Sequence, residues 1–385
     1  MILRADALNI PLTDESVQCV VTSPPYWGLR DYGLEPTVWG GSQGCLPGRG
    51  HEWGEEIIGG EGYSSGRKRK WQHGADRDSD PEGWQKGTVQ GQFCSLCSAW
   101  LGCLGLEPTP ELYVEHIVAI FREVRRVLRS DGTVWLNLGD SYAGSWSGNS
   151  LRPEGGSQRA GEPGFQPLDD GRYSPRGGNV PAGLKPKDLV GIPWRVALAL
   201  QSDGWWLRSD IIWSKPNPMP ESVRDRPTRA HEYLFLLTRS ARYFYDAKAI
   251  AEPWESGRDD MRHHGVRTGV AYLQQESAAS NFNKGDRVAE RNQHDYKGGR
   301  NRRSVWTIAT EPYPGAHYAT FPKKLVKPCV LAGSNPGDVV LDPFCGKGTT
   351  VEVAMGLGRF GIGLDLDTDL AAKELDGVKF QGVLL

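Results

Sequence analysis

The sequence predicts an α/β protein built on a mostly parallel β-sheet. Apolar, strand-like runs alternate with helix-like periodic segments along much of the 385 residues. One β-branched run, 17–22, stops at two prolines, and another, 339–341, leads into a glycine loop and a helix. Helical crossovers between consecutive strands place those strands parallel to one another.

The N-terminal half contains one clear strand and one clear helix. The strand is Val17–Thr22, and it ends because the prolines that follow cannot donate to a sheet ladder. The helix is expected to begin at Pro110 after the N-cap Thr109 and to end at Gly132. Its buried stripe is predicted from apolar residues near helical spacing, namely Leu112, Val114, Ile117, Val118, Phe121, Val124 and Leu128.

The remaining regular elements lie between long polar stretches. We expect, in order, a strand in 132–144, a helix in 189–204, a strand in 205–215, a strand hairpin in 231–246, and a strand–loop–helix–strand unit in 337–367. Three polar stretches are expected to be irregular. They are an insertion at 36–106, predicted to be flexible, a low-complexity loop at 145–183, predicted to be mobile, and the segment 247–303.

Charge and apolar content exclude several classes of protein. The formal net charge of −2 excludes a uniformly basic surface, so nucleic-acid binding would require local patches. The first residues are too short and too charged for a signal peptide, and no apolar run approaches the length of a membrane span. We therefore expect a cytoplasmic protein without a membrane anchor, whose seven cysteines are thiols or metal ligands.

The glycine loop near the C-terminus has the pattern of a nucleotide-binding βαβ unit. Gly346 and Gly348 follow a strand and open a helix, which allows a tight turn and close approach of a ligand. The next strand ends at Asp365, where a carboxylate can accept hydrogen bonds from ribose hydroxyls. Alone, the glycines also fit a turn without a ligand. The absence of a third glycine disfavours a nicotinamide-dependent oxidoreductase.

Two strand-end motifs, "TSPPY" (22–26) and "DPFCGKGTT" (342–350), can share one crevice because ligands bind at the carboxyl ends of parallel strands. Together they resemble the S-adenosylmethionine-dependent DNA amino-methyltransferases of the permuted beta order. "WSKPNPMPES" and "HYATFPKKLV" extend the resemblance over most of the chain outside the polar insertions.

The resemblance implies a Rossmann-like, mostly parallel seven-stranded sheet with helices on both faces. It also implies four parts: 1–35 with 107–219 as the catalytic half, 36–106 as an insertion, 220–305 as the target-recognition segment, and 306–385 as the half that binds S-adenosylmethionine. Double-stranded DNA is the implied partner, a cognate restriction endonuclease is a second one, and the protein is expected to be a monomer or a homodimer.

The resemblance assigns the catalytic motif to Ser23, Pro24, Pro25 and Tyr26. The Ser23 hydroxyl and the Pro24 carbonyl can accept hydrogen bonds from the exocyclic amine of a base, and Tyr26 can stack on a base flipped out of the duplex. Similar enzymes with serine first mostly methylate cytosine at N4, and those with aspartate mostly methylate adenine at N6. Ser23 therefore favours cytosine, with adenine as the alternative. Cys329 is expected to pack in a helix, which disfavours a covalent cysteine mechanism.

The cofactor residues are also carried over from the family. Thr320 and Phe321 are expected on one side of S-adenosylmethionine and Asp6 near its adenine, with Asp365 on the ribose and Asp367 as a competitor. The full set implied is Asp6, Thr320, Phe321, Asp342, Phe344, Gly346, Gly348, Thr349 and Asp365.

Cysteine spacing in the first insertion predicts a structural zinc site. Cys94 and Cys97 form a Cys-x2-Cys pair, and Cys45 with His51 supplies two more ligands of suitable softness. A polar insertion has little core of its own, so a metal would anchor it. Cys103 in place of His51 and, less readily, His73 are alternatives, and the thiols could instead be unpaired.

Basic residues cluster in two runs and in the expected target-recognition segment. The runs and the additional arginines are Arg67, Lys68, Arg69 and Lys70; Lys297, Arg300, Arg302 and Arg303; and Arg224, Arg226 and Arg229. Such runs are usually solvated surface, but an enzyme acting on duplex DNA needs phosphate contacts. A zinc-containing DNA-binding protein without activity is the rival from another class, disfavoured by the intact "TSPPY" and glycine-loop motifs.

Overall fold

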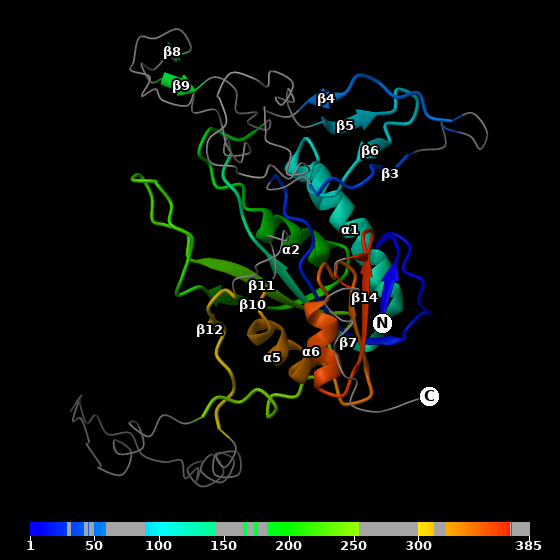
Figure 1. Cartoon of the computed structure of the whole chain (residues 1–385), viewed down its shortest axis with the longest axis vertical. Coiled ribbons are helices and arrows are strands. Elements are labelled where there is room, and N and C mark those ends of the chain that lie inside the picture. Colours follow the sequence, from blue (N-terminus) through cyan, green and yellow to red (C-terminus); the bar gives the residue numbers. More distant parts are fainter. Residues whose placement is uncertain are drawn as a thin grey trace, which may run out of the picture.

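The computed structural model describes residues 1–28, 32–41, 45, 50–58, 89–143, 165–167, 173–175, 183–253, 299–311, 321–369 and 371. Its main feature is a mixed sheet with the strand order β1-β14-β13-β2-β7-β11-β10-β12 (Figure 1). The strands are β1 (Ile2–Arg4), β2 (Val17–Thr22), β7 (Leu128–Leu138), β10 (Trp206–Ser214), β11 (His231–Thr238), β12 (Val305–Thr307), β13 (Val339–Asp342) and β14 (Phe360–Asp365).

All strands of this sheet except β11 run in one direction. β1, β14, β13, β2 and β7 pair in parallel, and β11 is antiparallel to both of its neighbours, β7 and β10. β12 then pairs in parallel with β10. The mostly parallel sheet is therefore confirmed. The carboxyl ends of the seven codirectional strands and the start of β11 lie along one edge of the sheet.

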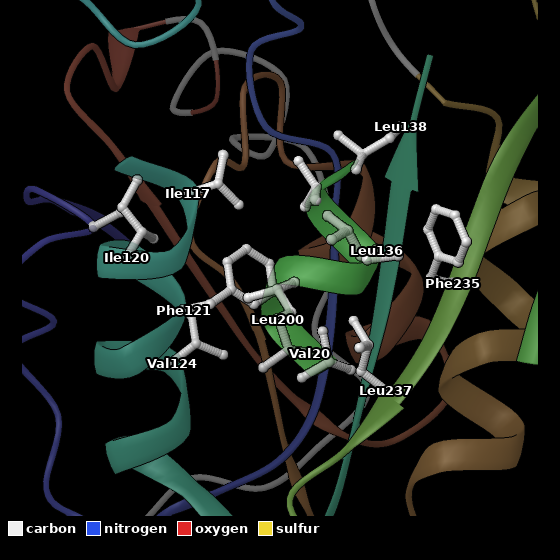
Figure 2. Close-up of a cluster of buried hydrophobic side chains, with 14 of the residues drawn as sticks. Val20, Ile117, Ile120, Phe121, Val124, Leu136, Leu138, Leu200, Phe235 and Leu237 are labelled. Carbon is white, nitrogen blue, oxygen red and sulfur yellow. The ribbon is translucent and has the colours of Figure 1, made fainter. Parts of the chain in front are cut away.

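Within the described residues, four helices cover the two faces of the sheet (Figure 1). They are α1 (Pro110–Val127), α2 (Ile192–Ser202), α5 (Lys323–Gly333) and α6 (Thr349–Gly356). The pleat of β2 shows the division, because Val20 belongs to the core cluster of α1 and α2 whereas Cys19 and Val21 belong to that of α5 and α6. Figure 2 shows the first cluster, in which Phe121 of α1 and Leu136 of β7 lie together. Every residue of β2 is buried, as expected for a central strand.

Helix α1 begins as predicted and ends earlier than predicted. The Thr109 hydroxyl accepts a hydrogen bond from the Leu112 N–H at 3.2 Å, with Pro110 in the first turn. The helix ends at Val127, and Leu128 is already extended because it begins β7. Gly132, the expected terminator, lies inside β7. Of the predicted stripe, Ile117, Phe121, Val124 and Leu128 are fully buried, whereas Leu112, Val114 and Val118 are half-buried.

The predicted hairpin in 231–246 is wrong in its second half. Only His231–Thr238 is a strand, and it pairs with β10 and β7 instead. The following residues are held by other bonds: Ser240 Oγ donates to Ser130 O at 2.8 Å, and Phe244 N donates to Asp131 O at 2.8 Å. Alternating aromatics here pack on the α5 side of the sheet and do not form a strand.

Two further differences concern strand number and the insertion. The described sheet has eight strands where seven were expected, since the three-residue strand β12 adds to its edge. Within 36–106, predicted to be flexible, four strands form a separate antiparallel sheet of order β3-β6-β5-β4, namely β3 (Thr37–Trp39), β4 (Ile57–Ile58), β5 (Val89–Phe93) and β6 (Trp100–Gly102). Residues 59–88 lie outside the described part. Two short strands, β8 (Phe165–Pro167) and β9 (Tyr173–Pro175), pair with each other.

Candidate active site at the carboxyl edge of the sheet

The two sequence motifs meet at the carboxyl edge of the main sheet. β2 and β13 are neighbours, with Cys19 opposite Val340 and Val20 opposite Leu341. The residues that follow these strands therefore share one edge although they are some 300 positions apart. Asp365 ends β14, and Asp6 follows β1, the neighbour of β14. The parallel pairing thus brings the predicted catalytic and cofactor segments to one place.

Tyr26 is the centre of a polar cluster at this edge. Its hydroxyl lies 2.8 Å from Glu232 Oε2 and 3.0 Å from Asn137 Oδ1, and Ser23 Oγ donates to it at 3.2 Å. Lys215 makes an ion pair with the other oxygen of Glu232. Burial and the charge of Glu232 raise the pKa of Tyr26 well above its usual value, so its hydroxyl stays protonated as a donor.

The turn that carries the predicted catalytic motif is tightly packed against two glycines. A Cβ at Gly139, directly after β7, would lie 2.6 Å from Cε2 of Tyr26, so the Tyr26 ring lies against bare backbone. A Cβ at Gly105 would lie 3.2 Å from Tyr26 O, and Gly105 has a φ of +93°. Tyr113 of α1 donates to Pro25 O at 2.9 Å. Pro24 is buried, while Ser23, Pro25 and Tyr26 are partly exposed at the edge.

Asp342 braces the two motifs against each other. Its carboxylate accepts hydrogen bonds from the hydroxyl of Thr22 at 2.6 Å, the hydroxyl of Thr350 at 2.7 Å and the N–H of Phe344 at 3.1 Å. The residue is 1 % exposed, and burial raises the pKa of its carboxyl to about 6, with Asp365 adding to the rise. Asp342 therefore ties the end of β2 to the start of α6.

The glycine loop is held by Asp365. Gly346 N donates to Asp365 Oδ2 at 2.8 Å, and Gly346 and Gly348 have positive φ values of 50° and 87°. Thr349, buried, begins α6 directly after Gly348, and Phe344 is half-buried against the α1 core cluster. The side chain of Asp367 instead accepts from Asp369 N, so Asp365 is the acid that contacts the loop.

The other two predicted cofactor segments are partly described. Asp6 Oδ1 accepts from Leu8 N at 2.9 Å in the turn after β1. Phe321 precedes α5 and packs against the second core cluster. Thr320 lies outside the described residues.

Sequence reasoning missed three polar residues of the Tyr26 cluster, namely Asn137, Lys215 and Glu232. Asn137 lies near the end of β7, Lys215 follows β10, and Glu232 is the second residue of β11. Their positions at strand ends could have indicated that they lie at the same edge of the sheet as Tyr26. The antiparallel pairing of β11 with β7 was not predicted, and without it Glu232 could not be placed beside Tyr26.

The predicted metal ligands of the insertion come together. The ligand atoms of Cys45, His51, Cys94 and Cys97 all lie within 4.8 Å of one another. Cys45 Sγ is 3.5 Å from Cys94 Sγ, and Cys97 Sγ is 3.4 Å from His51 Nδ1. These separations suit the corners of a tetrahedron around one zinc ion, whose bonds to sulfur and nitrogen are about 2.3 and 2.0 Å.

The environment of Cys94 suits a thiolate ligand. Burial acts to raise its pKa, but backbone N–H groups of Leu96 and Cys97 and the side chain of His51 outweigh this and lower the pKa of Cys94 to about 6.

The other cysteines and the alternative histidine lie elsewhere. Cys103 lies outside the tetrad and donates to Leu34 O at 3.3 Å. His73 lies outside the described residues. Cys329 is buried in α5, as expected, and burial raises its pKa well above the usual value.

Several of the predicted phosphate-contacting arginines have partners within the protein. Arg226 pairs with Glu221 at 2.6 Å and lies 3.8 Å from the Tyr142 ring centroid. Arg300 and Arg303 both contact Glu252, and Arg302 lies over Trp306. Arg224 is exposed. The run 67–70 and Lys297 lie outside the described residues.

The helices of the described residues include none with the length and apolar character needed to cross a membrane.

Comparison with known proteins gives a consistent match over the whole chain. A family model described as DNA methylase, for N6 and N4 methyltransferases, matches residues 17–373. The Type II methyltransferase M.XycI of Xanthomonas campestris pv. cyanopsidis is 37% identical over 381 residues, covering 98% of this chain and 87% of that protein. M.SmaI of Serratia marcescens is 37% identical over 361 residues, covering 94% of this chain and 84% of that one.

Among solved structures, the PvuII DNA methyltransferase (cytosine-N4-specific) matches with a TM-score of 0.50 and 13% identity, covering 100% of this chain and 87% of that one, which shows a shared fold. The chain is a member of the N6/N4 DNA methylase family, and it is an S-adenosylmethionine-dependent DNA methyltransferase.

Proposed function

We propose that the protein methylates the N4 amine of a cytosine flipped out of duplex DNA. The observation that carries this proposal is the cluster at the end of β2, where Ser23 and Tyr26 lie beside the acceptors Asn137 and Glu232. An exocyclic amine is a poor nucleophile because its lone pair is delocalised into the ring. Acceptors placed around its N–H groups favour the pyramidal nitrogen that can react.

The residues of the glycine loop fit S-adenosylmethionine. The carboxylate of Asp365 at a strand end suits ribose hydroxyls, and the positive φ values of Gly346 and Gly348 let the backbone approach a ligand closely. Asp6, Phe321, Phe344 and Thr349 complete the described part of this side, with Thr320 also assigned by the family motif. When bound, the cofactor supplies an electrophilic methyl group for direct in-line displacement by the amine.

The remaining residues hold the base and brace the site. Ser23 Oγ and the Pro24 carbonyl accept hydrogen bonds from the amine, which directs its lone pair away from the ring plane. The Tyr26 ring, seated on Gly139, stacks on the base. Asp342 stabilises the turn by accepting a hydrogen bond from the hydroxyl of Thr22, the residue before Ser23. Pro25 fixes the backbone of the turn through its bond from Tyr113.

Cytosine is favoured over adenine by Ser23 at the first position of the motif. The PvuII enzyme, which shares the fold, is named as cytosine-N4-specific. The test is to incubate the protein with S-adenosylmethionine and duplex DNA, digest the DNA and measure the nucleosides by mass spectrometry. We expect N4-methylcytosine. N6-methyladenine alone would refute the base assignment and leave the enzyme class intact.

The role of Ser23 is tested by Ser23→Ala. We expect methylation to fall by about two orders of magnitude, as for loss of one aligned polar contact in a reacting site, while cofactor binding measured by calorimetry is unchanged. Ser202→Ala is the matched control, because Ser202 lies at the exposed end of α2 and its hydroxyl donates to Leu198 O within the same helix. Wild-type turnover by Ser23→Ala would contradict the mechanism.

We infer that Cys45, His51, Cys94 and Cys97 hold a structural zinc ion. The support is the tetrad of ligand atoms within 4.8 Å and the lowered pKa of Cys94. With four protein ligands the coordination shell is closed, so the ion would stabilise the insertion sheet and take no part in methyl transfer.

We also propose how the enzyme meets its substrate. Residues 220–305 outside β11 supply target recognition, with Arg224 and the basic runs on phosphates. Following the order of the family, we assign 1–35 with 107–219 to the catalytic half and 36–106 to the insertion. The half that binds S-adenosylmethionine is 306–385. Because Type II methyltransferases of this kind act with a restriction endonuclease on cellular DNA, we infer a cognate endonuclease and a cytoplasmic location, and a monomer or homodimer.

A further inference from the structure

A buried hydrogen-bonded pair of side chains that methyl transfer does not use joins the turn with the catalytic motif to the insertion. Glu107 is 0 % exposed and His116 of α1 is 5 % exposed, and Glu107 Oε1 lies 2.9 Å from His116 Nδ1. Removing two ionisable groups from water is costly unless further hydrogen bonds satisfy them. The partners of this pair therefore indicate what it holds in place.

On one side, Glu107 is bonded to the turn that carries the catalytic motif. Its Oε2 accepts from Gly105 N at 2.8 Å, and its backbone carbonyl accepts from Trp27 Nε1 at 2.9 Å. Gly105 in turn accepts from Gly28 N at 2.8 Å. Glu107 thus fixes residues 27–28 directly after Tyr26, and fixes them through both its side chain and its backbone.

On the same helix, Tyr113 lies one turn before His116 and donates to Pro25 O at 2.9 Å. The position of α1 therefore determines the position of the Pro25 carbonyl. A rotation or shift of α1 would move Pro25 and His116 together, and the turn between them would follow.

Toward the insertion, two indoles of its sheet stack on His116. The Trp39 ring of β3 stacks on it with centroids 4.4 Å apart at 26°, and the Trp100 ring of β6 does so at 5.2 Å and 23°. Trp39 and Trp100 are opposite each other in the pairing of β3 with β6. The His116 imidazole is therefore in stacking contact with two indoles of the insertion sheet.

Trp100 itself sits in a site made by two glycines. A Cβ at Gly91 would lie 2.4 Å from Trp100 Nε1, and a Cβ at Gly102 would lie 2.2 Å from Trp100 Cζ2. Gly91 and Gly102 are paired across β5 and β6. Any side chain there would displace the indole, so the sheet is shaped to keep Trp100 against His116.

Two residues of the tetrad, Cys94 and Cys97, lie directly before Trp100 in the chain. Cys94 N donates to Ala99 O at 2.8 Å, which closes the turn that carries Cys97 and leads into β6. A continuous series of contacts therefore runs from the tetrad through Trp100, His116 and Glu107 to the catalytic turn.

We propose that Glu107 and His116 are positioning residues for methyl transfer, and that the insertion acts through its two indoles to fix residues Ser23–Gly28 in the productive conformation. This inference rests on the proposed role of that turn in catalysis. In this proposal, neither Glu107 nor His116 touches the base or the cofactor. Their effect reaches the turn through Gly105, Trp27 and Gly28.

Two substitutions at His116 separate the stacking on the indoles from the hydrogen bond with Glu107. His116→Phe keeps a ring between the indoles and removes the contact with Glu107. His116→Asn keeps a nitrogen donor near Glu107 and removes the stack. Glu107→Gln is the conservative variant, because its amide can still accept from Gly105 N and donate to His116. Arg122→Gln, on the exposed side of α1, is the matched control.

Hydrogen–deuterium exchange of the full chain is the readout that does not depend on activity. For His116→Phe we expect faster exchange in peptides covering 23–28 and 105–107, and unchanged exchange in β13 and α6. Turnover should fall about tenfold, as for loss of one buried hydrogen bond, with the dissociation constant for S-adenosylmethionine within about twofold. Glu107→Gln should stay within about threefold of wild type, and Arg122→Gln should be unchanged.

Two results would overturn the inference. Uniformly faster exchange over the whole sheet would mean that the pair only stabilises the fold, and unchanged exchange at 23–28 with unchanged turnover would mean that the turn does not depend on it. If wild-type protein methylated no DNA, the proposed function would fail, and the exchange pattern would still decide whether the pair fixes the turn.

Discussion

At the scale of single residues, Tyr26 combines a ring and a hydroxyl whose roles can be separated. Tyr26→Phe removes the contacts with Glu232 and Asn137 and keeps the ring on Gly139. Tyr26→Ala removes both. Since base–aromatic stacking contributes about 1–3 kcal/mol, we expect Tyr26→Ala to weaken DNA binding about 5- to 150-fold, and Tyr26→Phe to lower turnover with little effect on DNA affinity.

The measurement is steady-state kinetics together with the fluorescence of a base analogue at the target position, which reports flipping. Equal DNA affinities for Tyr26→Ala and wild type would show that the ring does not stack on the base.

Asp342 gives a prediction on pH. Its folded-state pKa of about 6 lies above the ordinary value of 3.8, so the folded protein binds this proton more tightly than the unfolded chain does. Its contribution to stability is therefore full below about pH 3.8 and is lost as the pH rises through 6, a change of about 3 kcal/mol. Asp342→Asn does not titrate, so its free energy of unfolding relative to wild type should rise by about that amount from acid to neutral pH.

Urea unfolding at several pH values measures this difference. Asp188→Asn is the control of opposite sign, because hydrogen bonds from Lys185 lower the pKa of Asp188 and stabilise the folded state at neutral pH. A difference between Asp342→Asn and wild type that did not change with pH would contradict the raised pKa.

At the scale of elements, the end of β7 positions the Tyr26 ring. Gly139→Ala would place a methyl group 2.6 Å from Cε2 of Tyr26, so the ring must move. We expect turnover to fall at least about tenfold, comparable to a small misplacement of a reacting group, while the dissociation constant for S-adenosylmethionine stays unchanged. Gly356→Ala, at the end of α6 with no atom within 4 Å of the new Cβ, should leave turnover unchanged.

Both variants can be compared by single-turnover kinetics. If Gly139→Ala were as active as Gly356→Ala, the position of the Tyr26 ring would not limit methyl transfer.

How far the sequence predicted each element depended on the range of the contacts that define it. β2 follows from a short pattern, a β-branched run before two prolines, and was placed correctly. The tetrad was predicted from a Cys-x2-Cys pair and a second Cys/His pair, and its four ligand atoms lie close together in the structure. The second half of the 231–246 hairpin failed because Ser240 and Phe244 bond to the backbone of β7, more than 100 residues away. Periodicity carries no information about such bonds.

The candidate site divides in the same way. Asp342 and Asp365 could be identified from their place at strand ends, whereas Glu232 required the position of β11 in the sheet. Glu107 and His116 gave no signal, since an acid and a histidine nine residues apart acquire meaning only when Trp39 and Trp100 are brought against them.

At the scale of the whole molecule, the insertion and the main sheet should respond differently to metal removal. We expect a strong chelator, or Cys97→Ser, to release one zinc ion per chain, to expose 36–106 to protease and to lower turnover, with cofactor binding retained. The metal content is measured by atomic emission and the cleavage sites by mass spectrometry. Cys103→Ser, outside the tetrad, should keep the metal. Full metal content in Cys97→Ser would contradict the assignment of ligands.

The place of β13 between β14 and β2 has a consequence for how the chain folds (Figure 1). During synthesis β2 emerges before β7, with which it pairs, yet the partner on its other side, β13, emerges only after about 320 further residues have been made. Until then the most buried strand of the enzyme is an open edge, which is prone to pair with other chains. Closure of the sheet is therefore expected to be late and slow, and the nascent N-terminal half is the stage at which aggregation would compete with folding.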